Sequence, residues 1–191
     1  MRKISWAVLL CLLITSTVVI ASSNTDAEYL KDVFTTREMS DSLHDAMAIL
    51  PRVLHEQKRQ QEEGADLTEK EQQLLDIWQE KSKGLKVVLV GFENCRPCLE
   101  LYNLLDTETD TKCWIERMEE QGVEFYMLNF YKEFQEREYT EENLIRIWNV
   151  TSIPALLIIK DGLPVARLNG YNRNKSEEIL QILDKEIAKN K

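Results

Sequence analysis

A short apolar segment runs almost directly into two closely spaced cysteines, and this junction constrains the fold more than any other feature of the sequence. Residues 85–90 (LKVVLV) form a nearly continuous apolar run, which is typical of a strand buried on both faces. The motif Cys95-Arg96-Pro97-Cys98 follows, and we expect a helix to begin near Cys95. Because a strand buried on both faces needs helices to cover it, the junction predicts an α/β fold.

The remainder of residues 85–191 alternates between strand and helix patterns. Further strands are predicted at residues 123–128, 155–159 and 165–168. The last two should pair through a turn at Asp161-Gly162. A helix is predicted after Thr140, which can act as its N-cap, and another from residue 174 onward. This order predicts one domain with a mixed sheet covered by helices.

Residues 22–84 are predicted to form a helical N-terminal extension. Apolar residues recur there at helical spacing, as Met39, Leu43, Met47, Leu50 and Leu54. Pro51 should kink or restart this helix, and Thr68 with Glu71 forms a capping box that starts another. Two roles stay open, because the stripe is short for a coiled coil. The extension is either a scaffold packed on the core or an arm that docks a partner or a second copy, which would give a homodimer.

Residues 1–21 have the pattern of an export signal. Arg2 and Lys3 precede an uncharged run from residue 4 to residue 21, and small or short residues lead up to Ser22. We expect cleavage there, and hence a periplasmic protein in a bacterial envelope. The alternative is a retained anchor that leaves the domain on the periplasmic side of the inner membrane, since the run is at the lower limit of spanning length. Membrane association is expected only in that case.

Charge and histidine content exclude several classes of function. Acidic residues outnumber basic ones by 33 to 24, which gives a net charge of -9 and argues against a nucleic-acid partner. The sequence holds only two histidines, His44 and His55, so catalysis by a Ser-His-Asp or Cys-His set and a multi-histidine metal site are not expected. We predict neither a metal nor an organic cofactor.

The two cysteines at the predicted helix start suit thiol chemistry. A thiol at a helix N-terminus is stabilised as thiolate by the unpaired N–H groups and the helix dipole, so Cys95 is the expected attacking thiol. Cys98 lies close enough to resolve the mixed disulfide, and the charge of Arg96 should favour the thiolate further. A zinc site lacks further ligands at useful spacing, and a c-type haem site would need histidine where Leu99 stands. Among the alternatives to redox chemistry, a structural disulfide fits the motif better than a zinc or haem site does.

Together with a second motif, this pair resembles the thioredoxin superfamily. The matching stretches are VVLVGFENCRPC, WNVTSIPALLIIKDGLPV and the following Gly170, within residues 85–189. The resemblance implies a thioredoxin-like fold in which Pro154 is cis and lies against the CxxC motif. It also implies that Ile153 offers its backbone to an extended substrate segment. Pro97 matches the proline of the family motif, while Arg96 replaces its usual glycine.

The resemblance implies a thiol:disulfide oxidoreductase that works with protein clients and a redox partner protein. Some departures bear on that reading: Leu89 stands where thioredoxin has an acidic residue, Asn94 where it has tryptophan, and the segment from Cys98 to Pro154 is longer. Pro97 favours a reductant by resemblance, whereas Arg96 favours a more oxidising couple, so both directions stay open. The alternative function is a thioredoxin-fold binding or assembly module with a structural CxxC disulfide.

A third cysteine of the mature chain is left without an obvious pair. Cys113 follows Cys98 by fifteen residues, about 22 Å along a continuous helix, which exceeds the Cα separation of about 7 Å that a disulfide permits. Trp114, Ile115 and Met118 follow at helical spacing. We therefore expect Cys113 to be a buried, poorly reactive free thiol rather than part of an intermolecular disulfide.

Overall fold

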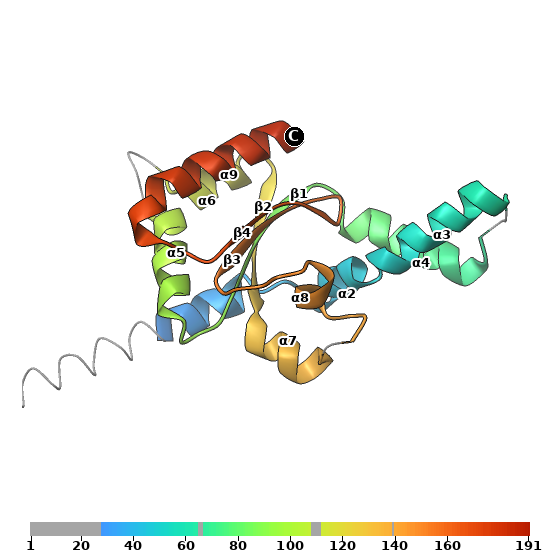
Figure 1. Cartoon of the computed structure of the whole chain (residues 1–191), viewed down its shortest axis with the longest axis horizontal. Helices are drawn as coiled ribbons and strands as arrows, with labels where there is room; N and C mark the ends of the chain where they lie inside the picture. Colours follow the sequence, from blue (N-terminus) through green and yellow to red (C-terminus); the bar gives the residue numbers. More distant parts are fainter. Residues whose placement is uncertain (1–27, 65–66, 108–111, 139) are drawn as a thin grey trace, which may run out of the picture.

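The computed structural model describes residues 28–64, 67–107, 112–138 and 140–191. The predicted signal or anchor segment, residues 1–21, lies outside them. A four-stranded sheet with the order β2-β1-β3-β4 forms the centre of the molecule (Figure 1). The strands are β1 Leu85–Gly91, β2 Val123–Asn129, β3 Ala155–Lys160 and β4 Leu163–Asn169. β1 pairs parallel with β2 and antiparallel with β3, which in turn pairs antiparallel with β4. The predicted mixed sheet is confirmed.

Helices cover both faces of this sheet. Their bounds are α2 Asp41–Ala48, α3 Leu50–Glu63, α4 Glu69–Lys81, α5 Arg96–Asp106, α6 Trp114–Glu119, α7 Phe130–Arg137, α8 Leu144–Ile147 and α9 Ser176–Asn190, with a 3-10 turn at Arg173–Lys175 and a further helical segment at residues 28–36. Helix 28–36, α5, α6 and α9 contribute to one buried cluster, and α2 and α8 to the other. Every residue of β1 is buried, because successive side chains enter opposite clusters.

The segment between β2 and β3 differs from the prediction. Thr140 does not cap a helix: the N-cap of α8 is Asn143, whose Oδ1 accepts the N–H of Arg146 at 3.1 Å. Thr140 instead lies in the turn before it, where its hydroxyl donates to the carbonyl of Arg137 at 2.8 Å. The capping role moves because α7, which the sequence analysis did not predict, ends only at Arg137.

The first part of the N-terminal extension is built into the core. Leu30, Val33 and Phe34 of helix 28–36 belong to the cluster on one face of the sheet, and the stripe residues Met39, Leu43 and Met47 belong to the cluster on the other. Between them the chain runs along the edge of β2, since the N–H of Met127 donates to the carbonyl of Arg37 and the N–H of Met39 donates to the carbonyl of Met127. This stripe therefore packs on the sheet within a single chain.

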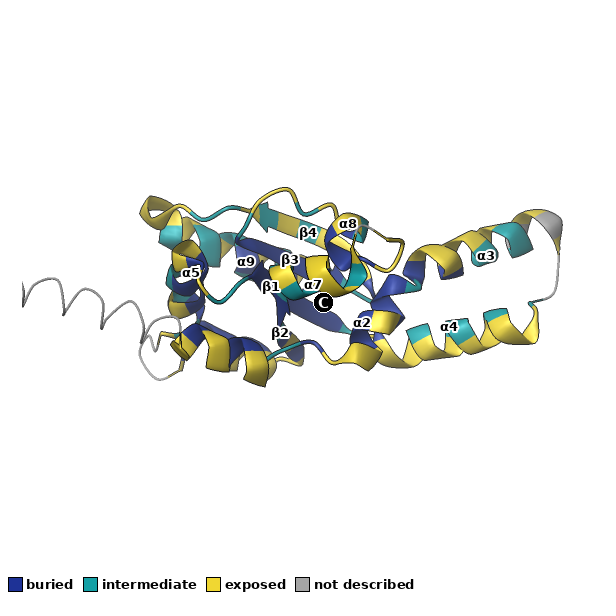
Figure 2. Cartoon of the chain, turned by 90° about the horizontal axis from the view of Figure 1, so that it is seen from below, coloured by how far each residue is buried: buried dark blue, intermediate teal, exposed yellow. Residues whose placement is uncertain are grey.

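The second part of the extension is a helical hairpin that projects from this body (Figure 2). α2 stops at Ala48, and α3 starts again with Pro51 in its first turn, as expected from a proline at that place. Gly64 ends α3 with a φ of 64°, and the capping box of Thr68 and Glu71 starts α4. α4 has no buried residue, so the hairpin is largely exposed to solvent.

Substitutions at the buried end of the stripe should reduce stability more than substitutions at its exposed end. Met47→Ala is expected to lower the free energy of unfolding by about 2–5 kcal/mol, because Met47 is 0% exposed and its loss leaves a cavity beside the sheet. Leu54→Ala, on the hairpin, removes a side chain that is 39% exposed and should cost less than about 1 kcal/mol. Urea denaturation of the two variants measures both values. Equal losses would contradict the packing of α2 described above.

Candidate redox site

Cys95 and Cys98 lie where the chain passes from β1 into α5. β1 ends at Gly91, and a turn closed by the N–H of Cys95 and the carbonyl of Phe92 at 3.1 Å leads to the helix. Cys95 is the N-cap of α5, and its Sγ accepts the N–H of Cys98 at 3.2 Å. The two cysteines form a disulfide with their Cα atoms 5.1 Å apart. Pro97 fits the first helical turn, where no N–H is needed.

The two sulfur-bearing residues differ in their access to solvent. Cys95 is 5% exposed, whereas Cys98 is 0% exposed. Cys95 is therefore the member of the disulfide that lies nearer to solvent. The N-cap position also points unpaired helix N–H groups at Cys95 Sγ, which favours a thiolate there in the reduced protein.

The lack of a side chain at Gly91 leaves space for the side chain of Cys98. A Cβ atom at this position would lie 2.9 Å from Cys98 Sγ and 3.3 Å from Cζ of Phe34 in helix 28–36. The absence of a side chain at Gly91 therefore leaves space that both Cys98 Sγ and the ring of Phe34, from the N-terminal extension, approach. The sequence analysis did not identify Gly91 or Phe34 as part of the site. A glycine at the end of a buried strand, shortly before the CxxC motif, is a signal for such a close approach.

Ile153 and Pro154 come to the same edge of the sheet. β3 starts at Ala155, which pairs with Val90, so that the residue before it stands level with Gly91. The Ile153–Pro154 peptide bond is cis, as the resemblance implies, and the carbonyl of Pro154 accepts the N–H of Gly170 at 2.8 Å. Pro154 is buried and Ile153 is half-buried. Their role in substrate binding stays a prediction.

The side chain of Arg96 is exposed and forms an ion pair with a carboxylate one turn later. Its Nε lies 3.3 Å from Oε1 of Glu100. Part of its charge is therefore compensated on the outer face of α5. The influence of Arg96 and Pro97 on the pKa of the attacking thiol remains a prediction.

Comparisons with known proteins agree with this arrangement. A family model described as a thioredoxin-like domain matches residues 71–187, which include all four strands and the CxxC motif. The chain belongs to this thioredoxin-like family. No curated protein matches the chain at the threshold of significance.

Several solved thioredoxins overlap part of this thioredoxin-like chain. A thioredoxin from Fasciola hepatica is 25% identical and covers 58% of this chain and 92% of its own, with a TM-score of 0.37. Thioredoxin O2 from Arabidopsis thaliana is 17% identical and covers 57% of this chain and 85% of its own, with a TM-score of 0.37. A thioredoxin from Malassezia sympodialis is 16% identical, with coverages of 56% and 83% and a TM-score of 0.39. The family model over residues 71–187, and not these partial overlaps, assigns the chain to the family.

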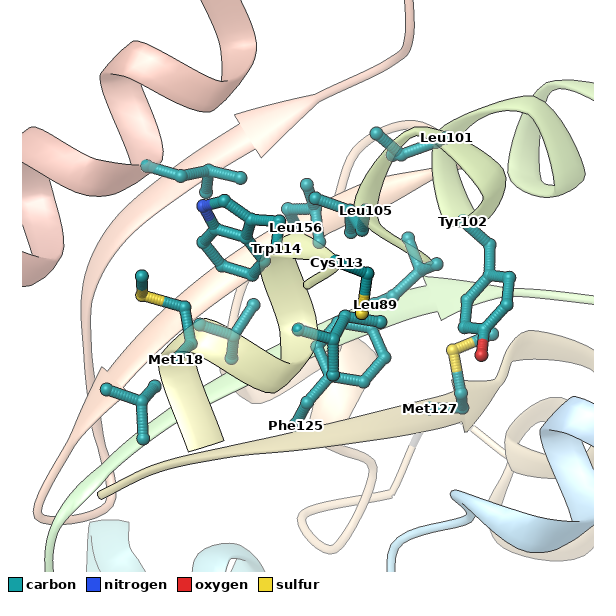
Figure 3. Close-up of a cluster of buried hydrophobic side chains, with 14 of the residues drawn as sticks. Leu89, Leu101, Tyr102, Leu105, Cys113, Trp114, Met118, Phe125, Met127 and Leu156 are labelled. Carbon is teal, nitrogen blue, oxygen red and sulfur yellow. The ribbon is translucent and has the colours of Figure 1, made fainter. Parts of the chain in front are cut away.

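The interior of the thioredoxin-like domain beneath α5 is apolar. Leu89, which stands at the position of the acidic residue of thioredoxin, is buried among Leu105, Phe125 and other members of the cluster (Figure 3). The described residues hold no group of three or more His, Cys, Asp or Glu side chains that could bind a metal ion. None of the helices in the described ranges combines the length and the apolar character that a membrane span requires.

One buried polar pair was not predicted. Nε2 of His44 in α2 lies 2.9 Å and 3.0 Å from the two carboxylate oxygens of Glu133 in α7. Oε1 of Glu133 also accepts the N–H of Leu144 at 2.8 Å, at the start of α8. The pair therefore joins three helices on the face opposite α5, and no signal in one sequence links residues so far apart.

Cys113 is a buried free thiol, as predicted. It is the N-cap of α6 and belongs, with Trp114 and Met118, to the cluster drawn in Figure 3. Burial raises the pKa of the Cys113 thiol, and the nearby carboxylates of Glu116 and Asp106 act in the same direction. The reactive thiolate is therefore scarce at neutral pH.

The burial of Cys113 should protect its thiol from alkylation in the native protein. Iodoacetamide added to the native oxidised protein at neutral pH should leave Cys113 unmodified, and the same treatment after denaturation should modify it fully. Peptide mapping by mass spectrometry measures both states. Recovery of a disulfide-linked peptide containing Cys113 from non-reduced protein would contradict the assignment.

Proposed function

We propose that this protein is an exported thiol:disulfide oxidoreductase that exchanges disulfides with protein clients. The observation that supports the proposal most is the position of the Cys95–Cys98 disulfide at the start of α5, with Cys95 nearer to solvent than Cys98. A helix N-terminus lowers the pKa of a thiol and makes it a better leaving group, which suits a disulfide that opens and closes.

In the reducing direction, the Cys95 thiolate attacks one sulfur of a client disulfide. The S–S bond of the client breaks, a Cys95–client disulfide forms, and the first client sulfur leaves as a thiolate. The Cys98 thiolate then attacks Cys95 Sγ, the mixed disulfide breaks, and the second client thiolate is released. Two electrons pass from the protein to the client. A redox partner protein restores the dithiol by the same exchange.

In the oxidising direction the same steps run in reverse. A client thiolate attacks Cys95 Sγ of the oxidised protein, and Cys98 leaves as a thiolate. A second client thiolate then attacks the client sulfur of the mixed disulfide, so that Cys95 leaves and the client gains a disulfide. The edge formed by Ile153 and Pro154 would hold the client segment as an added strand during either reaction.

Export is proposed from residues 1–21. Mass spectrometry of the protein recovered from its cell envelope should find the mature N-terminus at or within a few residues of Ser22. An intact N-terminus in a membrane fraction would instead support the anchored form, with the domain still in the periplasm. Recovery of the intact chain in the cytoplasmic fraction would contradict export.

A second candidate function is favoured by the α3–α4 hairpin. Its helices project from the body of the molecule (Figure 2). Leu54 and Ile77 are exposed on it. A binding or assembly module could use this hairpin, with or without a second copy, and keep the CxxC disulfide closed. Turnover separates the two functions: an oxidoreductase accelerates the reduction of insulin by a dithiol or the oxidation of a dithiol peptide, and a binding module accelerates neither.

A further inference from the structure

A pocket of about 310 Å³ lies beside the turn that leads into the attacking cysteine. One wall consists of Phe92, Glu93 and Asn94, the three residues that precede Cys95. The other wall comes from the start of α7, chiefly Tyr131 and Lys132. Because Asn94 directly precedes Cys95, the pocket adjoins the turn that carries the attacking thiol. α7 lies between Cys98 and Pro154, in the segment that is longer here than in thioredoxin.

Each wall of the pocket contributes one aromatic ring. The rings of Phe92 and Tyr131 lie 4.6 Å apart at an interplanar angle of 56°, and Phe130 adds an edge contact to Tyr131 at 5.8 Å. Tyr131 is 53% exposed, so its ring is available to a ligand as well as to its neighbour. Aromatic faces attract cations through their quadrupole, and they also pack against the aliphatic stems of long side chains.

The pocket also carries one uncompensated negative charge. Among the residues that the structure describes, Glu93 has no hydrogen-bond or ion-pair partner. Lys132, the cation of the opposite wall, is already neutralised, because its Nζ lies 2.6 Å from Oε1 of Glu38. The remaining polar lining groups, such as Asn94 and Gln135, are uncharged amides. The local charge therefore favours a cationic ligand.

We propose that this pocket binds a lysine or arginine side chain that lies close to the reacting cysteine of a protein client. The proposal rests on the proposed function, since the client reaches the pocket while it exchanges a disulfide with Cys95. The aliphatic stem would pack on Phe92 and Tyr131, and the charged head would pair with Glu93. The net charge of the chain, -9, attracts basic segments over longer distances in the same sense.

Other side chains fit the pocket less well. An acidic side chain would face Glu93 and be repelled, since like charges brought together at an interface are unfavourable. A large apolar side chain would cover the carboxylate of Glu93 without giving it a partner, and burying an unpaired charge is costly. A basic side chain alone satisfies both the aromatic walls and the carboxylate.

The test compares short peptides with one cysteine, each supplied as its symmetrical disulfide dimer, so that attack on either sulfur gives the same products. Lysine, glutamine or glutamate is placed in turn at each position flanking the cysteine. The second-order rate constant for the reduced protein is measured by quenching and mass spectrometry. At one position or more, the lysine peptide should react about five- to tenfold faster than the glutamine peptide, from an ion pair and a cation–π contact together.

Variants then locate this preference. In Glu93→Gln the lysine-to-glutamine rate ratio should fall by at least about twofold, because the carboxylate pair is lost while the aromatic rings and the shape are kept. In Glu80→Gln, which makes the same change of charge on the distant α4, the ratio should stay at the wild-type value. Comparing peptides within each variant cancels any change in the intrinsic reactivity of Cys95. Equal ratios in the two variants at every position would overturn the pocket and leave only long-range attraction.

A small neutral disulfide distinguishes failure of the pocket proposal from failure of the proposed exchange activity. Hydroxyethyl disulfide lacks a side chain for the pocket, so its rate constant reports the intrinsic reactivity of Cys95 in each variant. If the wild type reacts with neither this reagent nor any peptide, the proposed exchange activity is wrong. If it reacts with hydroxyethyl disulfide but shows no preference for lysine at any position, the exchange activity stands and the basic-side-chain pocket is wrong.

Discussion

Cys95→Ser is expected to lower the rate of disulfide exchange by at least about a thousandfold, to the background of the assay thiols. The reason is that Cys95 is the N-cap of α5 and the more exposed member of the pair, so we expect it to be the residue that attacks a client. Insulin reduction and dithiol-peptide oxidation measure the loss in the two directions. Activity that survives in Cys95→Ser would show that another residue is the nucleophile.

Cys98→Ser should give a different result at the same site. The attack by Cys95 is kept while the resolving step is lost, so a mixed disulfide with the client should accumulate and be visible on non-reducing gels. Cys113→Ser is the matched control: it removes a thiol of the same chain, and serine keeps the N-cap of α6. Cys113→Ser should therefore exchange disulfides at the wild-type rates and accumulate no mixed disulfide with the client.

Gly91→Ala is expected to lower the free energy of unfolding by about 1–3 kcal/mol, although alanine at an ordinary strand position is more stable than glycine. Alanine is expected to destabilise the protein here because its Cβ would lie 2.9 Å from Cys98 Sγ and 3.2 Å from Cys98 Cβ. The φ of Gly91 is not positive, so the backbone itself would accept alanine and only the contacts oppose it. Urea denaturation under reducing conditions measures the loss.

A double-mutant cycle attributes this loss to the sulfur. In a Cys98→Ala background the nearest clash is absent, so Gly91→Ala should cost at least about 1 kcal/mol less than in the reduced wild type. An equal cost in both backgrounds would show that the contact with Cys98 does not oppose the substitution. The wild type and all variants are compared in their reduced form, so that loss of the disulfide does not enter the cycle.

The elements around the site were predictable because their signals are local. The apolar run at residues 85–90 predicts a strand buried on both faces, and the structure buries β1 completely between two clusters. The capping box at Thr68 and the turn at Asp161-Gly162 also act over a few residues, and both formed as predicted. The CxxC motif and the Ile-Pro pair identified the family through their resemblance.

Other features depend on contacts between distant parts of the chain. α7 was missed and Thr140 was wrongly assigned as a cap, because the position of this segment is set by the buried pair of Glu133 with His44. The contact of Phe34 with the surroundings of Cys98 likewise joins segments that no local pattern connects. For the same reason the sequence left open whether the stripe at Met39 packs on the core or on a partner, whereas the structure shows it on the sheet.

The reduction potential of the Cys95–Cys98 disulfide tests the proposed function most directly. The protein is equilibrated in glutathione and dithiothreitol buffers of graded potential, quenched by alkylation and analysed by mass spectrometry. An oxidoreductase should titrate reversibly with two electrons between about -120 and -270 mV, the range of known exchange catalysts. A pair that stays oxidised below about -300 mV would be a structural disulfide, and the account of Cys95 as an exchanging thiol would then be wrong.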